Sequence, residues 1–310
     1  MDAVTAFAPA TVSNVACGFD VLGFALASPG DEVTARRTAS GVTIDDITGD
    51  AGRLPREAAR NTAGVAAQAL LRRAGEQRGV ALCIRKGLPL ASGLGGSAAS
   101  AAAAVVAVDA LFGLRSSIET LVACALEGEH LGAGSAHADN IAPSLCGGFV
   151  LVRQASPPDI VRLPVPAGLM AVVVHPDLEI ETAMARRLLG DTVLLKDAIQ
   201  QWANLGAFVD SLHRGDFDLM SRSLEDRIAE PRRAPLVPGL ASIKQAAVAA
   251  GALGCSLSGS GPSLFALCRG AESADRVAAA MTAAVQGHIG GTSQTYISPV
   301  APYGARVVSA

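Results

Sequence analysis

The chain has 310 residues, enough for two domains that each bury a core, and a formal net charge of −3 at pH 7. The weak charge and the lack of any dense Lys/Arg cluster exclude broad electrostatic attraction to nucleic acid or to an anionic membrane surface. Half of the residues are hydrophobic and 4% are aromatic, so the core is predicted to consist mainly of Ala, Val and Leu.

Two further features favour a reducing compartment inside the cell. The six cysteines are scattered without a CxxC pair or a zinc-ligand spacing, as is typical of free thiols. No segment approaches about 18 consecutive apolar residues, and a predicted strand begins almost at once, at Val4, which leaves no room for a signal peptide. We therefore expect a cytoplasmic protein that binds neither nucleic acid nor membrane.

The first half of the chain is predicted to contain short strands around one helix, then a glycine-rich loop and two further helices. Alternating and continuous apolar patterns indicate strands at 4–8, 21–27, 31–37, 42–47, 80–85 and 148–153. Helices are predicted at 61–74, 97–112 and 117–131, with a loop over 132–146.

Prolines mark a boundary near the middle of the chain, at Ser156-Pro-Pro-Asp, Pro164 and Pro166, and we divide the chain into domains 1–160 and 161–310. The second half is predicted to hold strands at 169–175, 254–258 and 263–268, helices at 182–189, 196–213, 239–250 and 272–285, and terminal strand material. Strands and helices interleave without a strict βαβα rhythm, which favours an α+β fold.

The segment Leu88-Pro-Leu-Ala-Ser-Gly-Leu-Gly-Gly-Ser-Ala-Ala99 is the most informative part of the sequence. Its glycines allow the backbone to curl around an anion, and the helix that follows offers unpaired N–H groups and a partial positive charge. It is neither a Walker A loop nor a GxGxxG fingerprint. The segment predicts a phosphate-binding loop, with a plain tight turn as the alternative from this segment alone.

Three segments share small residues, glycines and hydroxyl or carboxylate groups: Ala8–Asp20, the glycine loop, and Gly259–Ser263. In this order they resemble the three signature motifs of the GHMP kinases. The resemblance implies a two-domain α+β fold, with a ribosomal S5-like N-terminal domain that binds ATP and a ferredoxin-like C-terminal domain.

Within that superfamily the chain is most similar to the homoserine branch. The diagnostic pieces include His137-Ala-Asp-Asn-Ile-Ala-Pro143 and Glu230-Pro-Arg-Arg-Ala-Pro-Leu-Val-Pro238. This resemblance implies transfer of the ATP γ-phosphoryl group to the hydroxyl of L-homoserine, which gives O-phospho-L-homoserine in threonine biosynthesis. It also allows a homodimer.

The resemblance implies that polar residues around the motifs bind the ammonium and carboxylate groups of a small amino acid. A guanidinium pairs with a carboxylate through two hydrogen bonds, so the arginines suit the substrate carboxylate, whereas an ammonium needs an acceptor such as Asp20. The implied substrate-binding residues are Asn14, Asp20, His137, Thr182, Arg186 and Arg233. Taken singly, without the resemblance, each arginine is better interpreted as an ordinary surface charge and Asp20 as a turn cap.

The same resemblance implies sites for ATP and Mg2+. Mg2+ takes few protein ligands in phosphoryl transfer, and these are assigned to Ser97 and Glu129, whereas Glu127 would point elsewhere on the helix. The implied ATP-binding residues are Asn61, Lys86, Pro89, Leu90, Ala91, Ser92, Gly93, Leu94, Gly95, Gly96, Ser97, Gly259, Ser260 and Gly261. A helix N-cap explains Asn61 equally well.

Two departures from the family pattern lie in these motifs. The usual loop reads GLGSSAA, whereas Gly96 here replaces the first serine, which we expect to preserve activity and to alter ATP affinity. Val15-Ala-Cys17 stands where the family often has Leu-Gly-Pro.

The catalytic role is assigned to Asp139 and Asn140, which we expect to orient the acceptor hydroxyl. An aspartate that aligns with Asp139 acts as a base in mevalonate kinase-like members, and whether it does so here stays open. The alternatives are a GHMP kinase for another small alcohol, such as mevalonate or shikimate, and a catalytically silent protein of the same fold. Mevalonate has no ammonium to meet Asp20, and retained Ser97 and Glu129 argue against a silent protein.

Overall fold

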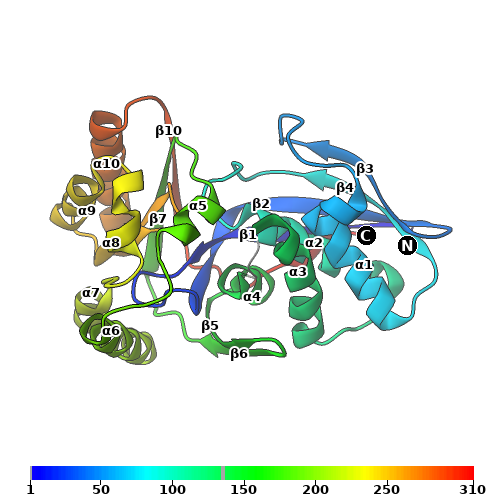
Figure 1. The fold of residues 1–310 in the computed structure, drawn as a ribbon, viewed down its shortest axis with the longest axis horizontal. Helices are drawn as coiled ribbons and strands as arrows, with labels where there is room; N and C mark the ends of the chain where they lie inside the picture. The colour runs from blue at the N-terminus through cyan, green and yellow to red at the C-terminus, as the bar shows by residue number, and fades with distance from the viewer. Residues whose placement is uncertain (1, 134–136) are drawn as a thin grey trace.

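Two β-sheets organise the fold of the computed structural model, which describes residues 2–133 and 137–310 (Figure 1). The larger sheet has the order β11-β1-β2-β4-β3, with β5 paired to β2 and β6 paired to β5. Its strands are β1 (Ala3–Ser13), β2 (Leu22–Thr38), β3 (Val42–Thr48), β4 (Gly79–Arg85), β5 (Phe149–Ala155), β6 (Pro158–Leu163) and β11 (Arg306–Ser309). The C-terminal strand β11 therefore returns to pair with β1.

Helices α1 (Thr62–Ala74), α2 (Gly96–Phe112), α3 (Ile118–Ala133) and α4 (Ala138–Cys146) accompany the larger sheet (Figure 1). Helix α2 packs on β1 and β2 and is contacted by α1, α3 and α4. All of its alanines except the partly buried Ala110 are buried, because a helix enclosed by other elements must be apolar all round and small side chains allow close approach. This packing places the N-terminus of α2 at a fixed point beside the sheet.

The smaller sheet has the order β10-β7-β9-β8, formed by β7 (Leu169–Pro176), β8 (Gly254–Leu257), β9 (Leu264–Arg269) and β10 (Ser293–Pro299). Helices α9 (Leu240–Ala249) and α10 (Ala271–His288) pack on it. The helices between β7 and β8 also include α5 (Thr182–Arg187), α6 (Leu195–Arg214), α7 (Phe217–Ser223) and α8 (Glu230–Arg233). Short 3-10 turns cover Ala58–Arg60 and Ala234–Leu236.

One hydrophobic core extends from the first half of the chain into the second. Phe24 and Phe149 have ring centroids 4.9 Å apart, Phe24 meets Phe265 at 5.9 Å, and Phe149 meets Phe208 at 5.8 Å. Phe265 belongs to β9 and Phe208 to α6, so buried aromatic contacts join the two sheets. The space between the halves is therefore bounded by elements that share a packed core.

The α+β fold is confirmed, and two element predictions are wrong. The part of the predicted loop 132–146 that the structure describes contains helix α4, which tolerates Pro143 inside it at the cost of one backbone hydrogen bond; residues 134–136 lie outside the described residues. The strands predicted at 21–27 and 31–37 are one strand, β2. Gly30 lies inside this strand, where a Cβ would lie 2.3 Å from Ala8 O, so this glycine permits close approach of β1.

Strand β6 and helices α7 and α8 were not predicted, since each is short. The domain boundary at 160/161 stays a prediction. No helix in the described part of the chain is long and apolar enough to cross a bilayer.

Candidate active site

A cavity of about 420 Å³ is lined by residues from both halves of the chain. The predicted site residues line it with two exceptions, Leu94 and Gly261. Leu94 is fully buried in the core, and Gly261 lies near Ile180 and Leu257. The fold thus collects residues that are spread from Asn14 to Ser260 in the sequence.

Several lining residues were not predicted from the sequence. Nothing in the type or spacing of these residues distinguishes them from ordinary surface or strand residues. They are Ser13, Arg53, Leu54, Pro55, Arg60, Thr62, Ile84 and Ser100. Asn61, which was predicted, also caps α1: its Oδ1 accepts from Ala63 N at 3.0 Å. Asn61 can therefore cap the helix and line the cavity at the same time.

The glycine loop ends in left-handed backbone and leads directly into α2. Gly93 and Gly95 have φ of +77° and +66°, and Gly95 is the N-cap of the helix. A Cβ on Gly93 would lie 2.4 Å from Ser258 O, and one on Gly95 would lie 2.1 Å from Thr11 Oγ1. Both glycines are needed for conformation and for space, and they leave the first N–H groups of a 17-residue helix open to an anion.

The turn between β8 and β9 supports this loop from the other half of the chain. Ser258 Oγ donates to Gly93 O at 2.7 Å, and Ser263 N donates to Ser92 O at 3.3 Å. The third sequence motif thus contacts the second motif directly, which fixes the position of the loop relative to the smaller sheet.

Lys86 lines the cavity, but its ammonium is engaged within the protein. Its Nζ pairs with the Asp31 carboxylate and donates to Gly96 O at 2.7 Å and Ser100 Oγ at 2.9 Å. The side chains of Lys86 and Asp31 are 2% and 0% exposed. These bonds use all three ammonium donors, so in this arrangement Lys86 supports the first turn of α2.

Two arginines of the second half meet the first motif at the cavity wall. Arg186, on α5, pairs with the Asp20 carboxylate, and Arg233, on α8, donates to Gly259 O at 2.9 Å. Both guanidinium groups lie over the Phe19 ring, at 5.5 and 5.3 Å from its centroid. Burial is the largest effect on Arg233 and lowers its pKa, while the charges of Asp20 and Asp226 oppose the shift. Cationic and anionic side chains therefore face one another here.

The first motif adopts an unusual backbone. Four of its non-glycine residues have left-handed φ, between +44° and +70°: Asn14, Val15, Ala16 and Asp20. This conformation is disfavoured for L-residues and needs support from its surroundings. Asn14 Nδ2 donates to Gly259 O at 2.9 Å, its Oδ1 accepts from Asp20 N at 3.0 Å, and Gln201 Nε2 donates to Cys17 O at 3.0 Å. The segment that departs from the usual family sequence is therefore held by hydrogen bonds from both halves.

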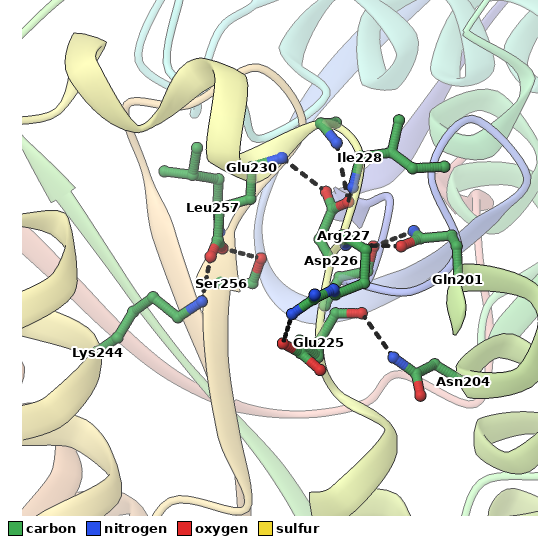
Figure 2. Close-up of polar contacts among 12 residues, drawn as sticks. Gln201, Asn204, Glu225, Asp226, Arg227, Ile228, Glu230, Lys244, Ser256 and Leu257 are labelled. Atoms are coloured by element: carbon green, nitrogen blue, oxygen red, sulfur yellow. Dashed lines mark hydrogen bonds and ion pairs between the residues drawn. The ribbon is translucent and has the colours of Figure 1, made fainter. Parts of the chain in front are cut away.

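Figure 2 shows the network that holds α8, the helix that carries Arg233. The Asp226 carboxylate accepts from the N–H groups of Ile228, Ala229 and Glu230, at 2.8, 2.9 and 2.9 Å. The buried Glu230 carboxylate accepts from Lys244 Nζ, Ser256 Oγ and Leu257 N. Two carboxylates thus fix a four-residue helix that could not form alone.

The electrostatics around α4 are dominated by carboxylates. Burial, reinforced by the charge of Asp20, raises the pKa of Asp139 to about 6. The pKa of His137 is raised overall. Burial, the largest single effect, lowers it, but a hydrogen bond to Glu129 and the charges of Asp139, Glu129 and Asp20 together outweigh burial. Perturbed titratable groups gathered in one cavity are typical of a catalytic site.

Glu129 provides an observation that fits a metal ion. Among residues 2–133 and 137–310 its buried Oε2 has no hydrogen-bond partner, and its Oε1 lies 3.7 Å from His137 Nδ1. An unpartnered buried carboxylate oxygen is costly unless a ligand compensates it. No group of three or more His, Cys, Asp or Glu residues in the described chain could hold a metal by itself. Glu129 and Ser97 both line the cavity, and one carboxylate and one hydroxyl suit Mg2+, which also uses phosphate oxygens as ligands.

Comparisons with known proteins agree with this geometry. The family "GHMP kinases N terminal domain" matches residues 61–148, and "GHMP kinases C terminal" matches 208–287. The homoserine kinase of Chlorobium phaeobacteroides (strain BS1) is 48% identical, over 99% of this chain and 100% of its own length. The homoserine kinase of Xanthomonas campestris pv. campestris (strain B100) is 44% identical, over 98% of this chain and 94% of its own length.

Solved structures give the same result. The crystal structure of homoserine kinase from Cytophaga hutchinsonii has a TM-score of 0.96 at 48% identity, and covers 99% of this chain and 98% of that one. Mevalonate kinase from L. major, in complex with R-mevalonate, has a TM-score of 0.70 at 19% identity, with 95% of each chain covered. At that identity the likeness extends to the fold alone.

Proposed function

The chain belongs to the homoserine kinases of the GHMP kinase family, and from this premise we propose which residues carry the reaction. The protein is an ATP-dependent kinase that transfers the γ-phosphoryl group of ATP to the hydroxyl of L-homoserine. The product is O-phospho-L-homoserine. The observation that carries the assignment is that one cavity holds both the phosphate-binding loop and the Asp20–Arg186 pair.

ATP binds at the loop end of the cavity. The N–H groups at the start of α2 and the flanking glycine backbone donate to phosphate oxygens, with Gly259 and Ser260 closing the site from the second half. Asn61 also lines the cavity, and in this proposal it contacts the adenine. Ser97 and Glu129 hold Mg2+, which neutralises charge on the β- and γ-phosphates when bound.

L-homoserine binds at the charged end. Its ammonium pairs with Asp20, beside Asn14, and its carboxylate pairs with Arg186 and Arg233, beside the Thr182 hydroxyl. This arrangement requires a zwitterion of fixed length, and so it favours an amino acid over mevalonate or a sugar. It leaves the side-chain hydroxyl directed toward the phosphate loop.

Asp139, Asn140 and His137 surround the hydroxyl in this proposal. The hydroxyl oxygen forms a bond to the γ-phosphorus while the bond from phosphorus to the β,γ-bridging oxygen breaks and ADP leaves. The hydroxyl proton passes to an oxygen of the transferred phosphoryl group and from there to solvent. With a pKa near 6, the Asp139 carboxyl is mostly ionised at pH 7.5, so it can accept a hydrogen bond from the hydroxyl and orient it. Catalysis then consists mainly of positioning and charge stabilisation.

ADP release tests the proposal directly. Purified protein with Mg-ATP is assayed with L-homoserine, and in parallel with L-serine, L-threonine, mevalonate, shikimate and galactose. Selective turnover of L-homoserine supports the assignment. Turnover of another alcohol instead would reject the placement of the substrate charges, and ATP binding without turnover of any acceptor would favour a silent protein.

We further propose that the enzyme acts in the cytoplasm as a homodimer. Support for the compartment comes from its six free cysteines, five of them buried, which suit a reducing environment. Support for the dimer is the family resemblance. Light scattering coupled to size-exclusion chromatography tests the dimer by mass, and a mass near 31.2 kDa would reject it.

A further inference from the structure

Thr11 connects the phosphate loop to the proposed catalytic helix. It is fully buried on β1, and its Oγ1 donates to Asn140 Oδ1 at 2.7 Å. Its backbone N–H donates to Leu94 O at 3.1 Å. A single residue of the first motif thus contacts both the loop that would hold the phosphates and the residue that would face the transferred group.

The loop backbone lies directly against the Thr11–Asn140 hydrogen bond. A Cβ on Gly95 would lie 2.1 Å from Thr11 Oγ1 and 2.8 Å from Asn140 Oδ1. Gly95 also precedes the first residue of α2, where the phosphate-binding N–H groups begin. The hydrogen bond therefore lies next to the point where the γ-phosphoryl group would be held.

We propose that Thr11 is a positioning residue for phosphoryl transfer: it holds Asn140 Oδ1, and so directs the Asn140 Nδ2 donors into the cavity. The side-chain amide is planar, with Oδ1 and Nδ2 on opposite sides, and Asn140 lines the cavity. Donors aimed at the transferred group stabilise the charge on its oxygens, whereas an amide or carboxylate oxygen in that place would repel them. The inference rests on the proposed function, because it places the reaction beside Asn140.

The test compares Thr11→Val with Thr11→Ser. Valine keeps the shape of threonine and removes the donor, so Asn140 loses the bond that fixes its amide. We expect Thr11→Val to lower kcat about 10- to 100-fold, with the KM values for ATP and L-homoserine within about threefold of the unmodified enzyme. Thr11→Ser keeps the hydroxyl and is expected to retain kcat within about threefold. Equal loss in both variants, or a loss confined to KM, would overturn the proposal.

A double-mutant cycle tests whether Thr11 acts through Asn140. If it does, Thr11→Val lowers kcat in the unmodified enzyme but has little further effect in an Asn140→Ala background. Additive losses would overturn the proposal. Ser144→Ala is the matched control, since its buried hydroxyl donates to Pro9 O of the same strand at 3.1 Å and lies outside the cavity lining; it should leave kcat unchanged.

One further variant keeps the proposal testable if Thr11→Val does not fold. Asn140→Asp retains an oxygen for Thr11 but replaces the donor by a second, anionic oxygen, so kcat should fall by at least 100-fold with a folded circular dichroism spectrum. Near-normal kcat would overturn the proposal. Failure of the unmodified enzyme to turn over L-homoserine would instead reject the proposed function itself.

Discussion

The Asp20 carboxylate and the Arg186 guanidinium form an ion pair that joins the two halves of the chain at the cavity wall. Their side chains are 33% and 43% exposed, so both remain accessible. A zwitterionic amino acid carries the same two charges within a few ångströms of each other. Its ammonium can replace Arg186 beside Asp20 while its carboxylate replaces Asp20 beside Arg186, and no charge is left unpaired by the exchange.

Asp20→Asn should therefore weaken binding of the acceptor and spare the nucleotide. A hydrogen-bonded charge pair contributes roughly 1.5–3 kcal/mol, so the KM for L-homoserine should rise about 10- to 100-fold while the KM for ATP changes less than about twofold. Steady-state kinetics with each substrate varied in turn gives both values. Glu179→Gln is the control, because the exposed Arg53–Glu179 pair also joins the two halves. An unchanged KM for L-homoserine in Asp20→Asn would remove Asp20 from the ammonium site.

Glu129 and Glu127 provide a matched test of the Mg2+ assignment. Both are on α3, but Glu129 lines the cavity with an Oε2 that no described residue contacts by a hydrogen bond, whereas Glu127 pairs with Arg72 and Arg73. Glu129→Gln should lower kcat by at least tenfold and raise the Mg2+ concentration needed for half-maximal activity. Glu127→Gln should change neither value. Calorimetric titration of Mg2+ into the complex with ATP checks binding apart from turnover, and equal affinities in the two variants would reject the assignment.

Features written locally in the sequence were predictable. The glycine loop can be recognised in the sequence because left-handed backbone before a helix favours glycine, and Gly93 and Gly95 both have positive φ. The long buried helix α2 follows from its run of alanines. The charged site residues were predicted only from the resemblance to a known family, because none of them can be distinguished by itself from an ordinary surface charge.

Features that depend on distant contacts were not predictable. Thr11 and Asn140 are 129 residues apart, and nothing near Thr11 in the sequence indicates its partner. That Lys86 binds ATP stays a prediction, and its buried partner Asp31, 55 residues away, became evident only once β2 and β4 were paired. Helix α4 was predicted to be a loop, whereas packing against β1, β2 and β5 stabilises a helix that includes Pro143.

Glu230→Gln should weaken acceptor binding without touching the acceptor. Its carboxylate fixes α8 through Lys244 and Ser256 (Figure 2). The same helix carries Arg233. Loss of the buried charge pair should raise the KM for L-homoserine about 3- to 10-fold and lower the free energy of unfolding by about 1 to 3 kcal/mol. The neighbouring Glu225→Gln removes only an exposed pair with Arg227 and should change both values little. A stability loss with no change in KM would separate α8 from the carboxylate site.

Gly95 and Gly96 are adjacent but should respond oppositely to substitution. Gly95 has a left-handed conformation, and a Cβ there would lie 2.1 Å from Thr11 Oγ1, so Gly95→Ala should lower kcat/KM for ATP at least 100-fold. At Gly96, the nearest atoms to an added Cβ are 3.5 Å away, so Gly96→Ser, which restores the usual family residue, should fold and remain active. Its extra hydroxyl should lower the KM for ATP by about two- to fivefold, because it can add at most one hydrogen bond to a phosphate. Inactive Gly96→Ser would show that the loop cannot accept a side chain there.

The buried Asp139 carboxyl should make folding stability depend on pH. Burial and the charge of Asp20 raise its pKa from 3.8 to about 6, so between these pH values the unfolded chain has lost a proton that the folded protein keeps. Stability from this group therefore falls as pH rises through that window and stays lower above it. The shift corresponds to a loss of about 3 kcal/mol in the free energy of unfolding above pH 6. Asp139→Asn should recover this stability at pH 8 and should give a smaller gain in stability at pH 5. Urea unfolding of both proteins at the two pH values measures the difference, and an equal gain at both would mean that the folded protein does not raise this pKa.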